Sequence, residues 1–377
     1  MKNFNAGVFK QQLDYKSFNP SLINRDFAIL DKEIYLLLEV TVSAISELRA
    51  ATNLTPNVDG FIKMHIIKEA TYSSRIEGTR TSIDEALLPE RKVVEESRDD
   101  WEEVQNYIKA LNLGAERIRE MPFSIRLLNE IHAKLLEGVR GENKTPGEIR
   151  RSQNWIGGVD IKRAKFVPPY HEDLPELLSD WEKFWHNKEI KVPVLIKIAI
   201  MHYQFETIHP YSDGNGRLGR LLMILQLIES GFLDKPILYI SNYLERYRGT
   251  YYDLIQKVRD ENSLEEWIKF MLKAFKESAE ESIDVLKQLS ELREDYRKQL
   301  QDLSSSKRVE YGRKLLEYML KEPIISVREV EKILEVSYPT ANSLIKELVK
   351  LKILTQATEG EVDRLFCLQS YVDIFKG

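Results

Sequence analysis

The sequence has a single cysteine, Cys367, and no apolar run long enough to span a membrane. One thiol cannot form an internal disulfide or a cysteine-type zinc site, so we expect Cys367 to be an inert buried residue. The longest apolar stretch, 192–203, is interrupted by Lys197, and the first residues lack the apolar segment of a secretory signal. These absences favour a cytoplasmic protein with no membrane partner.

No strong excess of one charge is present either, since 55 lysines and arginines stand against 60 aspartates and glutamates. The net charge of -5 argues against a protein that coats nucleic acid over its whole surface, although a local basic patch can still bind DNA. With 377 residues, 43% of them hydrophobic, the chain is long enough for two or three domains.

Long stretches contain little glycine or proline and repeat their apolar residues every three or four positions, which is the period of an amphipathic helix. The clearest example is 194–208, and another begins after Arg220 and ends at Gly231, a residue type common just beyond a helix end. Residues 276–303 predict a charged connecting helix. The pattern therefore predicts a mainly α fold.

Residues 154–169 depart from this pattern. Aromatic, β-branched and glycine residues are mixed there, ahead of Pro168 and Pro169. This composition predicts a short β-hairpin that stands off the helical body.

The C-terminal part is set off by the serine-rich segment 304–307. Residues 325–356 then predict two helices separated by a turn that contains Pro339, with the second helix starting at Thr340. An alternating segment follows and turns at 359–360, which predicts a two-stranded wing.

The densest group of polar residues, IHPYSDGNGRLGRLL at 208–222, joins two predicted helices. Residues 214–219 match the dinucleotide-binding fingerprint, but a helix rather than a strand precedes them, which argues against a Rossmann site. His202, Glu206 and His209 are conceivable metal ligands, but they lack the two-histidine spacing of zinc proteases. For His202 a satisfied, buried histidine is the more frequent outcome.

The same stretch fits a phosphate site. Gly214 and Gly216 let successive backbone N–H groups point inward at the start of a helix, whose dipole favours an anion. Arg217 and Arg220 lie three apart on the first turn and can offer forked donors to phosphate oxygens. The alternative is a polar helix connection with its arginines in solvent, but the dense spacing argues against it.

Two further residues add chemistry to this phosphate site. Asp213 is a hard oxygen ligand of the kind that Mg²⁺ takes beside a polyphosphate. His209 stands four residues earlier, where an imidazole can accept a proton from an attacking hydroxyl. The residues together predict phosphoryl or nucleotidyl transfer.

Residues 209–220 closely resemble the signature loop of Fic-domain protein adenylyltransferases, His-Pro-Phe-x-Asp/Glu-Gly-Asn-Gly-Arg-x-x-Arg, with Tyr211 in place of phenylalanine. The resemblance implies a helical core that binds ATP with Mg²⁺ and transfers AMP to a Ser, Thr or Tyr hydroxyl of a protein target or of itself. It implies His209 as general base, Asp213 as the Mg²⁺ ligand, and nucleotide binding by Gly214, Asn215, Gly216, Arg217, Leu218, Gly219 and Arg220.

Two other stretches are similar to parts of the same family. The predicted hairpin 154–169 resembles the flap that holds an extended target segment by strand addition. Residues 241–255 resemble the helix beside the adenine, with Tyr251 as the first candidate for adenine contact and Tyr252 as the second. For either tyrosine alone, packing in the core is an equally good interpretation.

Residues 73–78, SSRIEG, match the inhibitory pattern Ser/Thr-x-x-x-Glu-Gly/Asn of one class of the family. They end an amphipathic segment that begins near Asp59, with Gly78 placed just beyond the helix end. The resemblance implies that Ser73 supports the helix terminus and that Glu77 pairs with Arg220. The alternative is a surface glutamate on a capped helix.

Residues 305–377 resemble a winged helix-turn-helix, whose second helix reads the major groove in DNA-binding proteins. DNA contact through 325–368 and a protein-docking role are both open. The second predicted helix offers Asn342, Ser343, Lys346 and Lys350 beside Glu347, and the wing is acidic at Glu359, Glu361 and Asp363.

The sequence thus predicts four parts: an N-terminal helical region with the inhibitory helix at 1–110, a Fic-like core at 111–275, a connecting helix at 276–304 and the winged helix at 305–377. The favoured function is adenylylation of a protein target held by the flap, autoinhibited by Glu77. A de-AMPylating hydrolase, phosphocholine transfer and a nucleotide-sensing DNA-binding regulator remain alternatives, and a homodimer is compatible with the sequence.

Overall fold

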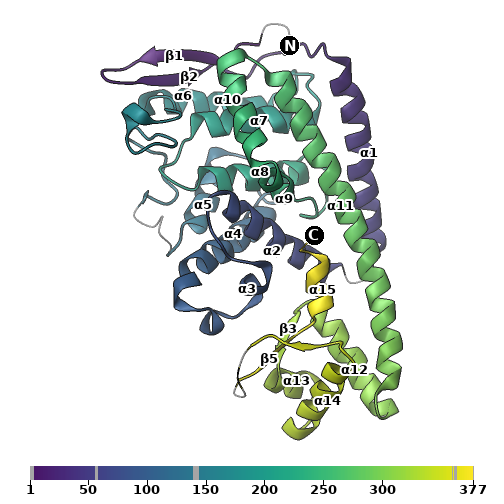
Figure 1. Cartoon of the computed structure of the whole chain (residues 1–377). Helices are drawn as coiled ribbons and strands as arrows, with labels where there is room; N and C mark the ends of the chain where they lie inside the picture. The colour runs from purple at the N-terminus through teal and green to yellow at the C-terminus, as the bar shows by residue number, and fades with distance from the viewer. Residues whose placement is uncertain (1–3, 56–57, 139–143, 359, 361–362, 377) are drawn as a thin grey trace.

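The computed structural model describes residues 4–55, 58–138, 144–358, 360 and 363–376, and this part of the chain is mainly helical, as predicted (Figure 1). The longer helices are α1 (Lys32–Leu54), α2 (Asp59–Ile76), α4 (Arg98–Arg117), α5 (Ile125–Leu135), α6 (Leu174–His186), α7 (Val194–Ile208), α8 (Asn215–Glu229), α10 (Arg248–Glu261), α11 (Leu264–Gln299), α12 (Ser306–Met319), α13 (Val327–Leu334) and α14 (Tyr338–Lys350). The shorter ones are α3 (Ile83–Leu87), α9 (Ser241–Arg246) and α15 (Gln369–Ile374).

Helices α7 and α8 form the centre of the fold. Every residue of α7 from Leu195 to Ile208 is buried, and α8 is buried from Arg217 to Leu227. A helix that is covered on all sides must lie inside the protein, and these two pack against each other with α2, α4, α5, α6 and α11 around them. The segment that joins them is the polar stretch singled out by its sequence.

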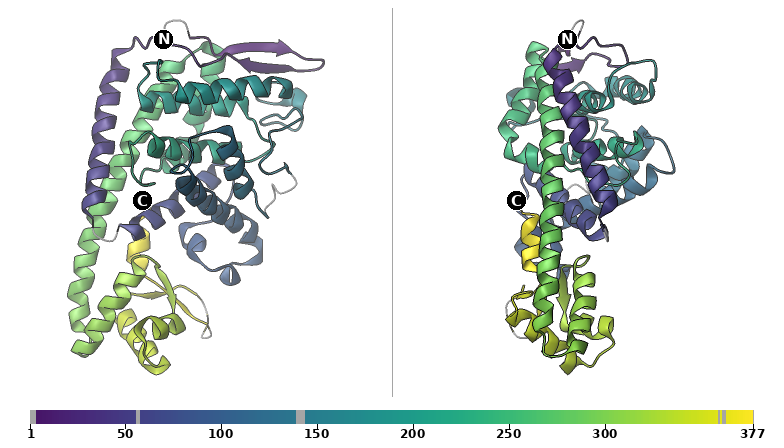
Figure 2. Two further views of the ribbon diagram at one scale, coloured as in Figure 1. Left: turned by 180° about the vertical axis from the view of Figure 1, so that it is seen from behind. Right: turned by 90° about the vertical axis from the view of Figure 1, so that its right-hand side faces the viewer.

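Helices α1 and α11 lie side by side along one edge of the molecule (Figure 2). Helix α11 has 36 residues, about 54 Å at 1.5 Å per residue, and runs from the helical body to the C-terminal part of the chain. Its exposed face is charged, as was predicted for the connecting helix at 276–303. Among the described helices none is both long enough and apolar enough to cross a membrane.

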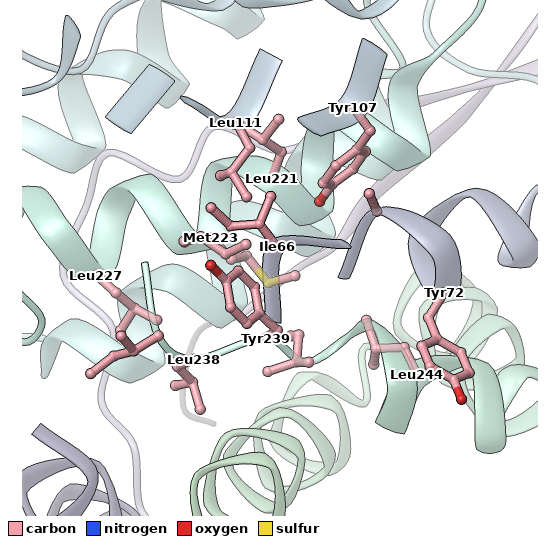
Figure 3. Close-up of a cluster of buried hydrophobic side chains, with 14 of the residues drawn as sticks. Ile66, Tyr72, Tyr107, Leu111, Leu221, Met223, Leu227, Leu238, Tyr239 and Leu244 are labelled. Atoms are coloured by element: carbon pink, nitrogen blue, oxygen red, sulfur yellow. The ribbon is translucent and has the colours of Figure 1, made fainter. Parts of the chain in front are cut away.

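Helix α2 is packed into the body by an apolar cluster (Figure 3). Ile66 of α2, Leu111 of α4 and Met223 of α8 meet there with Leu238 and Tyr239 from the segment before α9. Each of these side chains is at least 94% buried, and full burial of such a side chain contributes roughly 1.5–3 kcal/mol. The cluster therefore fixes α2 against the helix that follows the polar stretch.

Helix α2 is also held by a buried carboxylate at its middle. Glu69 accepts hydrogen bonds from the Tyr107 hydroxyl of α4 and from the Ser241 backbone and hydroxyl at the start of α9. Burial raises the pKa of this carboxyl, although the hydrogen bonds oppose the shift. Ser73 and Glu77 follow Glu69 at intervals of four residues, so all three lie along the same side of α2.

The strands are few and short. An antiparallel pair that the sequence analysis did not predict, β1 (Gly7–Gln11) and β2 (Lys16–Pro20), projects from the body in the register Gly7↔Pro20 (Figure 1). In the C-terminal part, β3 (Ile324–Ser326), β4 (Thr355–Gln356) and β5 (Leu365–Cys367) form a sheet in the order β3-β5-β4. Cys367 is buried there, which raises the pKa of its thiol to about 12.

The C-terminal module, which we define as residues 305–376, has the element order α12, β3, α13, α14, β4, β5 and α15 in its described part. The turn between the two helices is shorter than predicted, because α14 begins at Tyr338 and takes Pro339 into its first turn. Proline suits that position, since its missing N–H has no partner there in any helix. The predicted wing turn at Glu359, together with Glu361, lies outside the described residues, and the winged-helix assignment stays a prediction.

The side chains proposed for DNA contact are partly occupied within this module. Asn342 accepts a hydrogen bond from Arg364, and Ser343 accepts one from Arg308. Glu347 forms an ion pair with Arg308 at 3.0 Å. DNA binding through 325–368 remains a prediction.

The C-terminal module packs along α2, from its first turn to near its C-terminal end. The Tyr72 hydroxyl donates a hydrogen bond to the Lys376 carbonyl, and Lys63 pairs with Glu322. Gly60 lies so close to the module that a Cβ placed on it would be 1.9 Å from the Leu320 carbonyl oxygen. The predicted part boundaries at 110 and 275 fall inside α4 and α11, so these helices run unbroken from one predicted part into the next.

The close approach at Gly60 gives a direct test of how the module docks. We expect Gly60→Ala to lower stability by about 1–3 kcal/mol, because the added methyl group must displace either α2 or the backbone at Leu320. Gly249→Ala is the matched control, since nothing lies within 4 Å of its Cβ and alanine favours a helix. Thermal unfolding and proteolysis of the C-terminal module measure the effect; equal stability of the two variants would contradict this docking geometry.

Candidate functional site

The polar stretch turns sharply at two residues with positive φ. His209 ends α7 with φ 49°, and Gly214 precedes α8 with φ 74°. A left-handed conformation is unfavourable for histidine and persists only where surrounding contacts impose it. Here the His209 N–H donates to the Phe205 carbonyl at 2.9 Å, and its own carbonyl is held from outside the loop.

That outside contact is Arg150, a buried arginine that the sequence analysis did not single out. Its guanidinium donates to the carbonyls of His209 and Ser152 at 2.9 and 3.0 Å and to that of Pro169 at 2.6 Å. Its backbone N–H also donates to the Pro210 carbonyl. Burial lowers the pKa of this guanidinium to about 10, so it is still charged at neutral pH. Arg150 thus joins the polar stretch to both ends of the predicted hairpin.

His132 of α5 holds the other side of the loop. Its Nδ1 accepts the Gly147 N–H at 2.8 Å, so the proton lies on Nε2, which donates to the Asp213 carbonyl at 3.0 Å. The ring stacks on Tyr211 with a centroid distance of 3.8 Å. Burial lowers the pKa of His132 to about 4, so the ring is neutral at physiological pH.

Inside the loop, Asn215 closes the turn with its side-chain amide. Its Oδ1 accepts the Tyr211 N–H at 2.9 Å, and its Nδ2 donates to the Tyr211 carbonyl at 2.8 Å. Both ends of the amide are therefore used to fold the loop. The backbone N–H groups at the start of α8 remain to form the anion cradle.

The two arginines of α8 are buried rather than solvent-exposed, which excludes the interpretation of a simple polar turn. Arg217 donates from Nη1 to Glu103 of α4 at 2.9 Å. Its Nε is buried and has no hydrogen-bond partner among the described residues. A buried donor without a partner is costly, and a phosphate oxygen is a ligand that would satisfy it.

Arg220 is bound by the end of α2. Its Nε donates to the Ser73 hydroxyl and its Nη2 to the Ser73 carbonyl, both at 2.9 Å, and Nη2 also contacts Glu77 Oε1 at 2.6 Å. The family resemblance implied that Ser73 supports its own helix end, whereas here Ser73 binds Arg220. Helix α2 ends at Ile76, with Gly78 at φ 111°, so the turn at the helix end aims Glu77 at α8.

The Glu77 carboxylate also covers the start of α8. A Cβ placed on Gly216 would lie 2.2 Å from Glu77 Oε1, so only glycine leaves room for this contact. Burial alone would raise the pKa of Glu77, but the charge and hydrogen bond of Arg220 lower it overall. The side chain is therefore an ionised carboxylate that lies in the anion cradle.

His209 is a neutral base at physiological pH. Burial, followed by the charges of Arg150 and Arg259, lowers its pKa to about 4. The imidazole can therefore accept a proton, as a general base requires. His202 does not belong to this group, because its Nε2 lies 2.9 Å from the Tyr251 hydroxyl in the core.

No set of three metal-binding side chains gathers anywhere in the described part of the chain, so a preformed protein metal site is not present there. Asp213 nonetheless suits a metal that arrives with a nucleotide. Its Oδ1 accepts the Gly214 N–H at 2.6 Å, and 45% of the side chain is exposed beside the cradle. One carboxylate together with phosphate oxygens is the usual way in which proteins hold Mg²⁺.

Comparison with known proteins agrees with this site. The Fic/DOC family N-terminal model matches residues 36–116, and the Fic/DOC family model matches 122–227. The chain belongs to the Fic/DOC family. The matched residues include α2, the loop before α8, nearly all of α4 and most of α8. Glu77 and Glu103, which bind the two arginines, therefore both lie within the matches.

Curated relatives include the protein adenylyltransferase Fic of Aedes aegypti, 31% identical over 211 residues, and that of Culex quinquefasciatus, 29% identical over 248 residues. These alignments cover 54% and 64% of this chain but 39% and 46% of the relatives, so the chain spans less than half of their length. Two solved structures share the fold: a Fic family protein from Desulfovibrio desulfuricans (TM-score 0.59, 18% identity, 91% of this chain and 98% of that one) and Fic-1 from C. elegans (0.54, 22%, 68% and 74%).

Several residues of the Fic motif have different surroundings from those the sequence suggested. Leu218 is fully buried, and Gly219 packs against α7, where a Cβ would lie 2.5 Å from Glu206 Oε1. Burial raises the pKa of Glu206 to about 7. Leu218 and Gly219 therefore pack α8 against the core.

The adenine candidate also needs a correction. Tyr251 is 1% exposed and its hydroxyl is bonded to His202, so it belongs to the core, whereas 42% of Tyr252 is exposed. Burial raises the pKa of both tyrosines and the charges of Glu77 and Arg220 act on both, so exposure is what distinguishes Tyr252 from Tyr251. An aromatic surface for adenine is thus available at the second candidate rather than the first.

The predicted flap, residues 154–169, is less regular than a hairpin. Only Ile156 and Phe166 pair, in one antiparallel bridge, and a 3-10 turn at Ile161–Arg163 fills the tip. The Phe18 N–H of β2 donates to the Val167 carbonyl at 2.9 Å, so the N-terminal hairpin continues the flap on one side.

The role of Arg150 in holding the loop and the flap can be tested by stability, without an activity assay. We expect Arg150→Ala to lower stability by about 3 kcal/mol, because it leaves buried carbonyls of the loop and the flap without donors. Arg151→Ala is the matched control, since 88% of that side chain is exposed. Denaturant unfolding, with hydrogen exchange of the flap, measures the difference, and equal stability of the two variants would remove Arg150 from this role.

Proposed function

We propose that this Fic domain binds ATP at the start of α8 and transfers AMP to a hydroxyl of a protein, and that Glu77 restrains the reaction. The observation that supports it most is the pair of buried arginines on α8, because one has an unsatisfied donor and the other is held by Glu77. The relatives named protein adenylyltransferase support the same chemistry at the level of the family.

In the proposed reaction, the hydroxyl oxygen of the target attacks the α-phosphorus and the bond to the β-phosphate oxygen breaks, releasing pyrophosphate. His209 accepts the hydroxyl proton as the new P–O bond forms. Backbone N–H groups of the cradle and the free Nε of Arg217 stabilise the phosphate charge. Asp213 would hold Mg²⁺, which supplies positive charge for the polyphosphate when it is bound.

Glu77 restrains this reaction by occupying the donor that the terminal phosphate needs. It holds Nη2 of Arg220 and fills the space above Gly216, so ATP must displace a charge-assisted contact in order to bind productively. A carboxylate in that space also repels phosphate oxygens. Inhibition therefore follows from the position of Glu77 and requires no other change in the core.

The flap is the proposed site for the target protein. Ile156 and Phe166 provide a short strand pair beside the loop that bears His209, and Trp155 next to it is 43% exposed. An extended segment can add to such an edge through its main chain, so that few target side chains are recognised. A target Ser, Thr or Tyr hydroxyl would then be brought toward His209.

The Glu77 carboxylate also favours a second function, the removal of AMP from a modified protein. Glu77 is ionised and lies close enough for its charge to act on the pKa of His209. A carboxylate in this position can orient water toward an AMP ester, so removal of AMP from a modified protein is the alternative reaction. The two functions predict opposite effects of removing Glu77.

We expect Glu77→Gly to raise self-labelling with α-labelled ATP by about 10-fold to 150-fold, because loss of a charge-assisted contact worth roughly 1.5–3 kcal/mol frees Arg220. The gain should disappear in Glu77→Gly combined with Arg220→Ala. Unchanged labelling by a well-folded Glu77→Gly protein would reject inhibition by this contact. Slower removal of AMP from a labelled protein, without a gain in labelling, would establish the hydrolase.

We expect His209→Ala, made in the Glu77→Gly protein, to lower transfer by about 10²-fold to 10⁴-fold while ATP binding is kept, because other groups form the cradle. In the parent, the rate should not fall between pH 8 and pH 6, since the pKa of His209 is about 4 and the base is lost only below it. Rate measurements against pH, with nucleotide titrations, provide the check. An acidic limb near pH 6.5 would show that burial does not lower the pKa of His209, and transfer that survives in the alanine variant would remove His209 as the base.

A further inference from the structure

Arg217 of the Fic motif has a partner outside the motif. Its Nη1 donates to Glu103 Oε2 at 2.9 Å, with 6% of the arginine side chain and 12% of the glutamate side chain exposed. Glu103 belongs to α4, and 114 residues separate it from Arg217 in the sequence. Both arginines are buried, but Glu103 is less exposed than Glu77, of whose side chain 36% is exposed, and it comes from a different helix.

The bond to Glu103 uses only Nη1 of Arg217 and leaves Nε and Nη2 for a ligand. Nε of Arg217 is buried without a hydrogen-bond partner among the residues described, and Nη2 lies 3.8 Å from Asp213 Oδ1. The arginine is thus fixed at Nη1, while Nε and Nη2 remain near the carboxylate that borders the anion cradle. A phosphate oxygen could accept from these donors without breaking the bond to Glu103.

The two glutamates differ in where they lie. Glu77 Oε1 is 2.2 Å from the position of a Cβ on Gly216, so it fills the cradle itself. Glu103 approaches Arg217 from α4 and is not among the atoms nearest to Gly214 or Gly216. Glu77 therefore competes with a nucleotide for an arginine, whereas Glu103 holds an arginine that a nucleotide can still reach.

We propose that Glu103 is a positioning residue that fixes the guanidinium of Arg217 for the phosphates of ATP; this inference rests on the proposed function. An arginine side chain loses rotamer freedom when it binds a ligand, and a partner that fixes it beforehand reduces that loss. A donor held in place before the substrate arrives also needs no rearrangement during the reaction.

The sign of the effect separates positioning from simple charge. If only charge matters, removing a negative charge near the polyphosphate should strengthen ATP binding, because the carboxylate repels the phosphates. If positioning matters, the same change should weaken ATP binding. The same substitution therefore has opposite outcomes under the two explanations.

The experiment uses the full-length Glu77→Gly protein, in which Arg220 is released. Calorimetric titration gives the Kd for ATP, and self-labelling gives KM and kcat separately. We expect Glu103→Ala to raise the Kd and KM for ATP by about 10-fold with a smaller change in kcat. Glu103→Gln, which keeps an oxygen that can accept from Nη1, should recover part of the loss.

Two controls make the result specific. Glu102→Ala removes the same charge from the preceding position of α4 and should leave the Kd within about 2-fold, because the hydrogen bond to Arg217 comes from Glu103. In a protein that already has Arg217→Ala, adding Glu103→Ala should cause no further loss. Thermal unfolding of each variant confirms that it is folded.

Tighter ATP binding by Glu103→Ala or Glu103→Gln would overturn the proposal and identify Glu103 as a second restraint. Equal weakening by Glu102→Ala, or an additional loss in the Arg217→Ala protein, would also overturn it. If the Glu77→Gly parent binds no ATP, the proposed function fails and this inference fails with it. Normal binding by the parent with an unchanged Kd in Glu103→Ala refutes the positioning role alone.

Discussion

The buried guanidinium of Arg220 is the constraint on which the arrangement of the site depends. The Arg220 side chain is 1% exposed, and a charge buried to that extent must be paired. The end of α2 provides a hydroxyl, a carbonyl and a carboxylate as its partners. The spacing from Glu69 to Ser73 and Glu77 places an anchor and both ligands on one side of the same helix. Helix α2 can therefore hold the arginine only while Glu69 and the apolar cluster keep it docked.

The opposite side of the site is built from contacts to backbone atoms. His209 has an unfavourable left-handed conformation. Arg150 fixes the carbonyl of His209 itself, and His132 fixes the carbonyl of Asp213 four residues later. Both partners bind main-chain atoms, so they fix the path of the loop directly. The imidazole proposed as the base thus lies in a turn that is held by two partners, while the restraint proposed for Glu77 acts at the other end of the cradle.

Sequence patterns predicted the parts of the site that depend on local spacing. Helices α7 and α8, the turn between them and the end of α2 at Gly78 follow from helical periodicity and end signals, and the family resemblance supplied the pairing of Glu77 with Arg220. Glu103 was not predictable, because it is one of several acidic residues at 99–103 and only the packing of α4 brings it to Arg217. Arg150 could not be told from Arg151 by sequence, and Tyr251 could not be told from Tyr252, because burial distinguishes each pair. The β1–β2 pair lacked a strong turn signal and depends on contact with the flap.

The central claim is that Glu77 denies Arg220 to the terminal phosphate of ATP. The most direct measurement is the ratio of the dissociation constants for ADP and ATP, by calorimetry, in the unmodified protein and in Glu77→Gly. If the claim is right, the unmodified protein binds the two nucleotides with similar affinity, and Glu77→Gly prefers ATP by about 10-fold or more, because only ATP has the phosphate that Arg220 would contact. The same ratio in both proteins would contradict it.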